Sequence, residues 1–224
     1  MAKTYFITGT DTEAGKTFVT ERLIKYFRAN NVNALGLKPV ASDSSIGKVE
    51  DDFSGLVNPD ALAIYRANES IVPFSQVNPF TYEAAIAPHI AAKNKGESLS
   101  VEALNKAVVL PDAELIFIEG AGGWLTPLNE KQTYADWVEA QKVDQKGFEV
   151  ILVVGRKLGC LNHAQLTIDN IKARGLKVAG WVANQIQPDM AFYEENLNWL
   201  KGNLNSPLLA EVGFNQPINS FSQQ

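Results

Sequence analysis

The chain alternates between short, continuous apolar runs and longer segments in which apolar residues recur at helical spacing. The apolar runs cover residues 5–8, 34–37, 115–118, 150–154, 178–182 and 208–212. The helical patterns lie between them, at residues 17–29, 60–67, 101–109, 162–174 and 191–200. Strands without polar alternation are buried on both faces, and strands that alternate with helices form parallel sheets. The pattern therefore predicts an α/β protein, a doubly wound parallel sheet with flanking helices.

One segment interrupts this alternation. Residues 42–58 are rich in Ser, Gly and Asp, and we expect a mobile loop there, near a functional site. The chain contains no internal repeat, low-complexity tract or linker, so we expect one domain over residues 1–224. The four tryptophans, Trp124, Trp137, Trp181 and Trp199, are expected in the core.

Composition narrows the classes of partner and compartment. Twenty-five acidic residues against 20 basic ones give a net charge of −5, which disfavours nonspecific binding to nucleic acid or anionic membranes. The single cysteine, Cys160, excludes an intramolecular disulfide and fits a reducing compartment; we interpret it as a small buried residue. No apolar run approaches the ~18 residues of a membrane span, and the first residues lack a signal-peptide pattern. We expect a cytoplasmic protein with no nucleic-acid or membrane partner.

The first candidate for chemistry follows the first predicted strand. Gly9 is separated from Gly15-Lys16-Thr17 by five residues, one more than in the common phosphate-binding loop. The loop leads from a strand into a helix, where backbone N–H groups and the helix dipole attract anions. Lys16 is then expected to reach the β- and γ-phosphates and Thr17 to ligate Mg²⁺. The competing interpretation, a Gly-Lys-Thr that merely begins a helix, is disfavoured by the preceding strand.

Two acids within this loop, Asp11 and Glu13, are unusual beside phosphates. A carboxylate 4 Å from a unit negative charge is repelled by about 4 kcal/mol at an effective dielectric constant near 20. At least one of them is therefore expected to point away from phosphate, toward a metal or a substrate amine. A solvated loop acid is the alternative, and the loop alone leaves both open.

Three more polar residues follow predicted strands, where open α/β sheets bind ligands. Lys38 can stabilise charge on a transferring phosphoryl group, Glu119 can ligate Mg²⁺, and the Asn184 amide suits the edge of a purine. Their ordinary alternatives are a surface lysine, a solvated loop acid and an asparagine that starts a turn.

Taken together, these segments closely resemble the dethiobiotin synthetase family. The matching motifs run in order through residues 9–17, 38–42, 58–62, 77–79, 87–89, 119–124, 157–163 and 180–184. The resemblance covers roughly residues 1–212, and the five-residue spacer of the loop is the family's own spacing.

The resemblance implies an ATP- and Mg²⁺-dependent ligase of biotin biosynthesis. Such an enzyme closes the ureido ring of dethiobiotin from 7,8-diaminopelargonate and CO₂ or bicarbonate. An amine takes up CO₂ to give a carbamate, the carbamate attacks the γ-phosphate, and the second amine displaces phosphate from the carbamic-phosphoric mixed anhydride.

The resemblance also implies roles for individual residues. Catalysis falls to Lys16 and Lys38, and Mg²⁺ binding to Thr17, Asp60 and Glu119. The implied substrate contacts are Thr12, Glu13 and Ser42. The implied ATP contacts are Glu13, Ala14, Gly15, Lys16, Thr17, Phe18, Asp60, Glu119, Gly120, Ala121, Gly122, Asn184, Gln185, Gly213, Phe214 and Asn215.

The family's active site lies between two subunits, so the resemblance implies a homodimer. The substrate carboxylate is then expected on backbone N–H groups of the neighbour's Gly159, Cys160, Leu161 and Asn162, where Asn162 opens a predicted helix.

The sequence departs from the family near the nucleotide base and near the second metal acid. Gln185 and residues 213–215 replace the residues often found there, so nucleotide affinity or base selectivity is open. Asp51 and Asp52 are alternatives to Asp60.

Three other functions compete with this one. An inactive or respecialised relative acting on another amine fits the altered tail. A regulatory ATPase of the partition type normally carries a lysine early in the loop, where this chain has Thr10, Asp11 and Thr12. A nucleotide kinase is disfavoured by the long loop and by the absence of an obvious arginine-rich lid.

Overall fold

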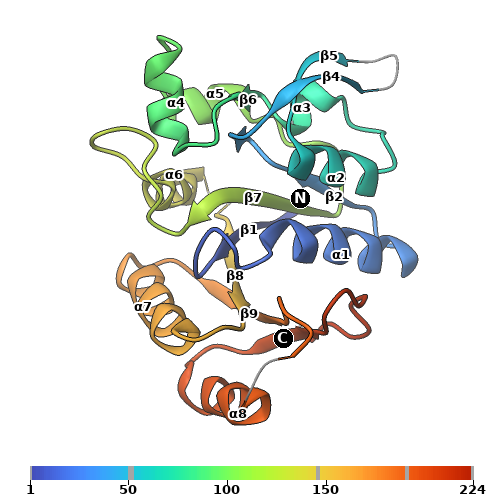
Figure 1. Ribbon diagram of the computed structural model, residues 1–224, viewed down its shortest axis with the longest axis vertical. Coiled ribbons are helices and arrows are strands. Elements are labelled where there is room, and N and C mark those ends of the chain that lie inside the picture. Colours follow the sequence, from blue (N-terminus) through green and yellow to red (C-terminus); the bar gives the residue numbers. More distant parts are fainter. Residues whose placement is uncertain (1, 50–52, 145–146, 190–191, 223–224) are drawn as a thin grey trace.

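A six-stranded sheet forms the centre of the computed structural model, which describes residues 2–49, 53–144, 147–189 and 192–222 (Figure 1). All neighbouring strands of this sheet run parallel, in the order β10-β9-β8-β1-β7-β2. The strands are β1 (Lys3–Gly9), β2 (Ala34–Leu37), β7 (Leu115–Gly123), β8 (Glu149–Gly155), β9 (Val178–Asn184) and β10 (Leu208–Val212). Each contains one of the predicted apolar runs.

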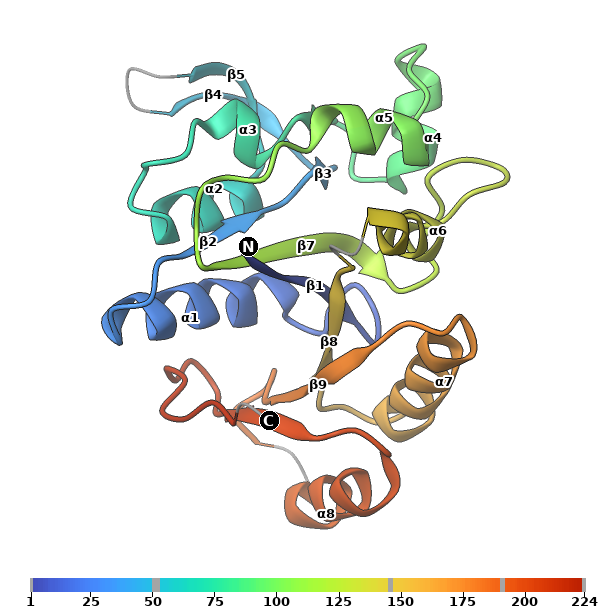
Figure 2. The same cartoon turned by 180° about the vertical axis from the view of Figure 1, so that it is seen from behind.

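Helices cover both faces of this sheet, which confirms the doubly wound prediction (Figures 1 and 2). One core cluster joins the sheet to α1 (Lys16–Ala29), α2 (Pro59–Ala67) and α3 (Phe74–Val77). The clusters of the opposite face include α4 (Pro88–Asn94), α5 (Val101–Ala107), α6 (Tyr134–Ala140), α7 (Cys160–Ala173) and α8 (Tyr193–Asn203). A 3₁₀ turn, Gln141–Asp144, follows α6. None of the helices in the described part of the chain has the length and apolar character needed to cross a bilayer.

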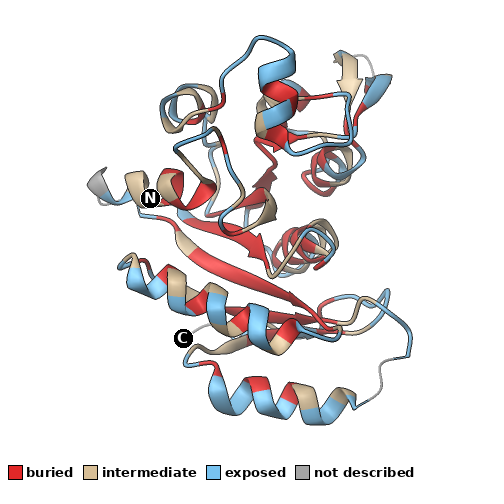
Figure 3. Cartoon of the chain, turned by 60° about the vertical axis from the view of Figure 1, so that its left-hand side comes forward, coloured by how far each residue is buried: buried red, intermediate tan, exposed pale blue. Residues whose placement is uncertain are grey.

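The central strands are buried on both faces because successive side chains point to opposite sides of the sheet (Figure 3). In β1, Tyr5 and Ile7 belong to the cluster with α1, whereas Phe6 packs against Trp124, Tyr134 and Trp137 on the other side. This two-sided burial leaves the chain's chemistry to the ends of the strands.

The order of the strands determines where that chemistry gathers. The chain leaves β1 toward β2 and β7 on one side, and later returns to β8 on the other side of β1. The carboxyl ends of β1, β7 and β8 therefore meet where the strand order reverses, which is where open α/β sheets bind ligands.

The expected mobile loop at residues 42–58 is wrong. Two antiparallel strands form there, β4 (Ser45–Val49) and β5 (Phe53–Val57). Asp51 and Asp52 lie outside the described residues. The Phe53 ring packs 5.0 Å from Phe74 of α3, centroid to centroid, so a distant aromatic residue anchors the hairpin. A second small sheet pairs β3 (Val40–Ala41) with β6 (Phe80–Thr81).

Other expectations need correction at single positions. Trp124, Trp137 and Trp181 are buried as predicted, and so is Cys160, but Trp199 on α8 is exposed. Helix α7 begins at Cys160, so Asn162 is its third residue and not its start. Strand β7 continues to Gly123; its regular pairing with β1 breaks after Glu119, which places that acid inside the strand. The predicted helix at 191–200 begins at Tyr193, while Ala191 lies outside the described residues.

Candidate active site

The phosphate-binding loop runs from the end of β1 to the start of α1, as its sequence predicts. Gly15 caps α1 with a φ of +79°, a left-handed conformation that favours glycine. A Cβ atom there would lie 2.2 Å from Nδ2 of Asn184. That same nitrogen donates a hydrogen bond of 3.0 Å to the Ala14 carbonyl, so the end of β9 holds the loop in place. The Oδ1 atom of Asn184 is buried without a hydrogen-bond partner.

Lys16 lies across this loop and is almost wholly buried. Its Nζ donates to the carbonyl oxygens of Asp11 at 3.1 Å and of Thr12 at 3.4 Å. Burial lowers the pKa of Lys16 to about 8, although the carboxylate of Glu119 acts in the opposite direction. An ammonium held by carbonyl oxygens alone is poised to gain a stronger partner when a phosphate enters the loop.

A second lysine forms a buried ion pair with Glu119 and also reaches the exposed carboxylate of Asp60. Lys38 Nζ lies 2.5 Å from Oε1 of Glu119 and 3.2 Å from Oδ2 of Asp60. The Thr17 hydroxyl donates to the same Glu119 oxygen at 2.7 Å. Burial lowers the pKa of Lys38, but the charges and hydrogen bonds of Glu119 and Asp60 outweigh it and raise that pKa above its ordinary value. The Lys38 ammonium therefore stays protonated beside the loop, paired with these two carboxylates.

The backbone around Lys38 is fixed by Asn78. The Lys38 N–H donates to the Val77 carbonyl at 2.9 Å, and Nδ2 of Asn78 donates to the Lys38 carbonyl at 2.7 Å. Asn78 is buried, and its Oδ1 accepts from the Thr81 hydroxyl at 2.6 Å. The segment that follows β2 is thus bonded to residues 77 and 78, and these bonds fix the backbone position from which the Lys38 side chain extends.

Asn58 joins the start of α2 to the segment that precedes β4. Its Oδ1 caps α2 by accepting from the N–H groups of Asp60 at 3.0 Å and Ala61 at 3.1 Å. Its Nδ2 donates to the carbonyls of Ser42 at 2.9 Å and Asp43 at 3.3 Å. One buried amide therefore positions the helix that carries Asp60 together with the segment that carries Ser42.

These groups face a cleft of about 970 Å³. The predicted site residues that line it are Thr12, Glu13, Gly15, Lys16, Thr17, Phe18, Lys38, Ser42, Asp60, Glu119, Ala121 and Gly122. Lining residues that the sequence did not single out are Ala41, Asp43, Asn58, Pro59, Ala85, Ile86, Ala87, Pro88, Thr126 and Pro127. Some of these residues stand in motifs that carry the family resemblance, and those motifs were the one sequence feature that could have identified them.

The other predicted site residues lie outside this cleft. Ala14 and Gly120 are buried beneath it, and the remaining residues, Gly159, Cys160, Leu161, Asn162, Asn184, Gln185, Gly213, Phe214 and Asn215, do not line it. The site therefore has one compact centre, and the roles of these outlying residues stay predictions.

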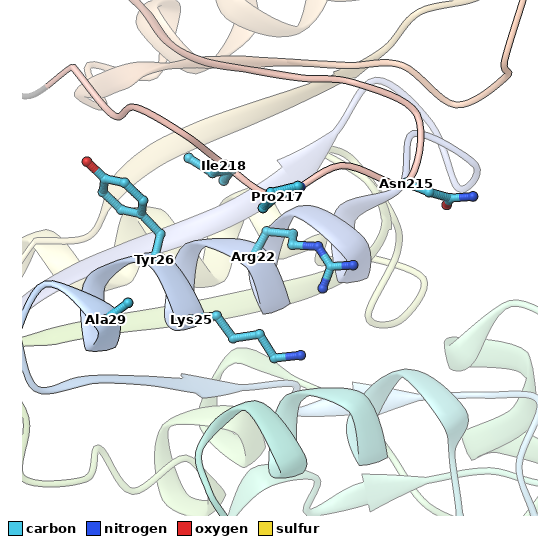
Figure 4. A pocket seen from close by; sticks show the side chains of 7 residues that line it. All are labelled: Arg22, Lys25, Tyr26, Ala29, Asn215, Pro217 and Ile218. Atoms are coloured by element: carbon cyan, nitrogen blue, oxygen red, sulfur yellow. The ribbon is translucent and has the colours of Figure 1, made fainter.

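A separate hollow of about 330 Å³ lies between α1 and the C-terminal segment, as Figure 4 shows. Asn215 lies at one end of it and Ala29 at the other. The Arg22 guanidinium, on its wall, stacks 4.5 Å from the ring centroid of Phe18, which lines the main cleft. Asn215 thus lies beyond Arg22, toward the start of α1, and does not line the main cleft.

The two loop acids share a lysine of the chain. Nζ of Lys157, just after β8, lies 3.2 Å from Oδ2 of Asp11 and 3.2 Å from Oε2 of Glu13. The Asp11 carboxylate also accepts from the Glu13 N–H at 2.9 Å. The cation that the loop acids face here is therefore Lys157. The sequence did not predict this pairing, because Lys157 and Glu13 are 144 positions apart in the chain.

The residues predicted for Mg²⁺ fit a hard divalent cation. Oε2 of Glu119 is buried without a hydrogen-bond partner, and its neighbours Thr17 and Asp60 supply further oxygen atoms. Within the described residues, no group of three or more His, Cys, Asp or Glu side chains forms a metal-binding cluster, so a cation here would need the Thr17 hydroxyl, phosphate oxygens or water as well.

The sequence matches known proteins over nearly its whole length. A family model described as an AAA domain matches residues 3–221. The chain is 41% identical to the ATP-dependent dethiobiotin synthetase BioD of Aeromonas hydrophila, covering 98% of this chain and 95% of that protein. It is 42% identical to the protein of the same name from Pseudoalteromonas translucida, covering 99% of this chain and 92% of that protein.

Solved structures support the fold alone. The cell division protein FtsY of Thermotoga maritima superposes with a TM-score of 0.55 at 14% identity, and chloroplast FtsY of Physcomitrella patens with 0.53 at 16%. The match covers 99% of this chain but only 66% and 63% of those two chains.

Proposed function

Because the chain belongs to the dethiobiotin synthetase family, we propose that it is an ATP-dependent ligase that makes dethiobiotin in biotin biosynthesis. Its substrates are 7,8-diaminopelargonate, CO₂ or bicarbonate, and ATP. The observation that carries the proposal is the buried cluster of Lys38, Glu119 and Thr17 beside the phosphate-binding loop, in a cleft large enough for a nucleotide and a second substrate.

The proposed reaction has three steps. One amine of the diamine adds to CO₂ and loses a proton, which gives a carbamate. A carbamate oxygen attacks the γ-phosphorus of ATP and ADP leaves, which gives a mixed anhydride. The second amine attacks the anhydride carbon and expels phosphate, which closes the ureido ring.

The protein's part in these steps is positioning and charge stabilisation. The loop's backbone N–H groups and Lys16 hold the β- and γ-phosphates, because α1 directs its N-terminus at them. Lys38, fixed through Glu119 and Asn78, offsets the negative charge that gathers between the carbamate and the transferring phosphoryl group. Thr12 and Ser42 contact the diamine, and Glu13 faces its amines.

Mg²⁺ is proposed on Thr17, Asp60 and Glu119. When bound there it would neutralise phosphate charge, as divalent cations do in phosphoryl transfer. The buried, unpartnered Oε2 of Glu119 supports this placement.

The adenine is proposed between the end of β9 and the C-terminal segment, with Asn184, Gln185 and residues 213–215 around it. The unpartnered, buried Oδ1 of Asn184 supports a role for this amide as an acceptor.

We further propose a single domain over residues 1–224 that works as a cytoplasmic homodimer, with the active site at the subunit interface. Gly159, Cys160, Leu161 and Asn162 would receive the substrate carboxylate of the neighbouring subunit. Leu158, which precedes this segment, is fully exposed, and Leu166 of α7 is exposed as well. These two apolar side chains support an interface here.

One assay tests the activity. The protein is incubated with MgATP, bicarbonate and 7,8-diaminopelargonate, and phosphate and dethiobiotin are measured together. We expect one phosphate for each dethiobiotin, and no turnover without the diamine. Absence of dethiobiotin, or phosphate release indifferent to the diamine, rejects the proposal. Release stimulated by DNA or lipid vesicles instead would favour the regulatory ATPase.

A further inference from the structure

The pairing of Lys157 with both acids of the phosphate-binding loop comes in addition to other bonds that hold the loop in shape. The loop already has the bonds of Lys16 to Asp11 and Thr12 and the bond of Asn184 to Ala14. The Lys157 contacts, at 3.2 Å each, add charge compensation for the two acids.

Lys157 acts on the cleft only through another residue. Glu13 lines the cleft, whereas neither Lys157 nor Asp11 does. The Glu13 side chain is 82% exposed and is free to change partner, while that of Asp11 is 27% exposed and is also tied to the Glu13 N–H. Lys157 can therefore stay with Asp11 when Glu13 turns toward a ligand.

The two substrates differ in charge, so they respond to these acids in opposite ways. Uncompensated carboxylates in the loop repel the phosphates of ATP. The same carboxylates attract the ammonium groups that an alkyl diamine carries near neutral pH. A cation that neutralises Asp11 and Glu13 thus favours ATP and competes with the diamine.

We propose that Lys157 is a positioning residue that neutralises the loop acids for ATP and then yields Glu13 to the ammonium of the second substrate. This inference rests on the proposed function for the identity of the amine. Lys157 would then help to select a cationic co-substrate by releasing Glu13, while its ion pair with Asp11 stays in place.

The proposal predicts effects of opposite sign on the two substrates. In Lys157→Met, the Kd for ATP, measured with a fluorescent methylanthraniloyl ATP, rises about two- to fivefold, the range of an exposed ion pair. In the same variant the KM for the diamine at saturating ATP falls about two- to fivefold, because Glu13 no longer has a competing lysine. A residue that only supported the fold would weaken both.

Matched variants separate charge from structure. Lys157→Arg should behave as wild type. Lys157→Met combined with Glu13→Gln should regain ATP affinity and lose the gain for the diamine. Lys177→Met removes the same charge at the opposite end of β8, from a pair with Glu149 of 2.6 Å, and should change neither constant. Unchanged constants in Lys157→Met, or losses for both substrates, overturn the inference.

The inference and the proposed function fail in different ways. If wild-type protein makes no dethiobiotin, the proposed function fails, while the ATP arm still tests the neutralising role of Lys157. If dethiobiotin is made and the two constants move in the same direction, only the inference fails.

Discussion

Two lysines of this protein each join two carboxylates, and their surroundings give the two clusters different properties. Lys38 joins Glu119 and Asp60 with its side chain 5% exposed and with Glu119 wholly buried. Lys157 joins Asp11 and Glu13 with its side chain 30% exposed and that of Glu13 82% exposed. Both lysines follow the carboxyl end of a parallel strand, so their local sequence contexts are alike.

Solvent makes the difference. A buried charge that loses its partner keeps the full cost of desolvation, so Lys38 and Glu119 cannot separate at small cost, although Asp60 of this cluster is 51% exposed. An exposed charge that loses its partner is hydrated, so the Lys157 cluster can rearrange at small cost. We infer that the first cluster serves fixed charge stabilisation and the second serves exchange between partners.

The largest effect is expected from Lys38→Met. This change leaves Glu119 charged and buried without its ammonium, so the free energy of unfolding should fall by about 3–5 kcal/mol. Dethiobiotin formation should fall by roughly 10²-fold or more, since charge at the reacting centre is uncompensated. Urea unfolding measures the first quantity, and the assay of phosphate and dethiobiotin described above measures the second.

A double variant tests the physical reason. Lys38→Met with Glu119→Gln should regain most of the lost stability but no activity. Stability unchanged in the single variant would contradict a buried ionic cluster.

An intermediate effect is expected at Asn58, which joins the hairpin to the Asp60 helix. Asn58→Asp preserves an acceptor for the cap of α2 and loses the two donated bonds to Ser42 and Asp43. We expect a KM for the diamine raised several-fold, on the order of the ~1 kcal/mol of one or two hydrogen bonds, with ATP affinity little changed.

Asn58→Ala is the matched control, because it loses the cap as well. It should lower the free energy of unfolding by a further ~1 kcal/mol. If Asn58→Asp leaves the diamine KM unchanged, the amide does not position the substrate side of the cleft.

A pH-dependent effect separates Lys16 from both clusters. Burial lowers the pKa of Lys16 to about 8, so the empty loop loses this charge as pH rises through that value. Bound phosphate favours the charged form, so binding of ATP saturated with Mg²⁺ should take up about half a proton near pH 8 and almost none at pH 6.5.

Calorimetry in two buffers of different ionisation enthalpy measures this uptake, and Lys16→Met should abolish the difference between the two pH values. Affinity that does not fall as pH rises through 8 would contradict a depressed pKa. The sign for stability follows from the same shift: between pH 8 and the ordinary value of 10.5 the unfolded chain binds more protons, so Lys16 makes stability rise with pH.

The smallest change in stability is expected from Glu13→Gln in the exposed cluster, within about 0.5 kcal/mol. Its functional effect should be selective: the KM for the diamine rises while the Kd for ATP stays the same or falls slightly. Equal losses for both substrates would contradict a carboxylate that faces the amines. Glu13→Gln should therefore impair function while stability is kept, whereas Lys38→Met should impair both function and stability.

Much of the fold was predictable because its signals are local. The apolar runs at residues 34–37 and 208–212 coincide with β2 and β10, and the helical pattern after the loop coincides with α1 to within one residue. The hairpin β4–β5 was missed because Ser, Gly and Lys interrupt its apolar residues, and because its anchor, Phe74, is distant in sequence. Trp199 was misplaced because a large apolar side chain says nothing about which face of its helix meets the sheet.

The site divides in the same way. Lys16, Thr17, Lys38 and Glu119 were identifiable, since each stands in or after a predicted strand or loop with a known chemical use. Asn58, Asn78 and Lys157 stand in motifs of the family resemblance but had no predicted role, because their roles consist of bonds to partners far along the chain.

The sequence by itself determined the class of fold, the phosphate-binding loop and the family, because spacing and hydrophobic periodicity are properties of neighbouring residues. The tertiary structure alone decided which charges meet and how much water reaches them. Lys38 and Lys157 look equivalent as residues that follow strands. They differ because packing buries Glu119 and leaves Glu13 in solvent, and burial determines whether an ion pair is fixed or exchangeable.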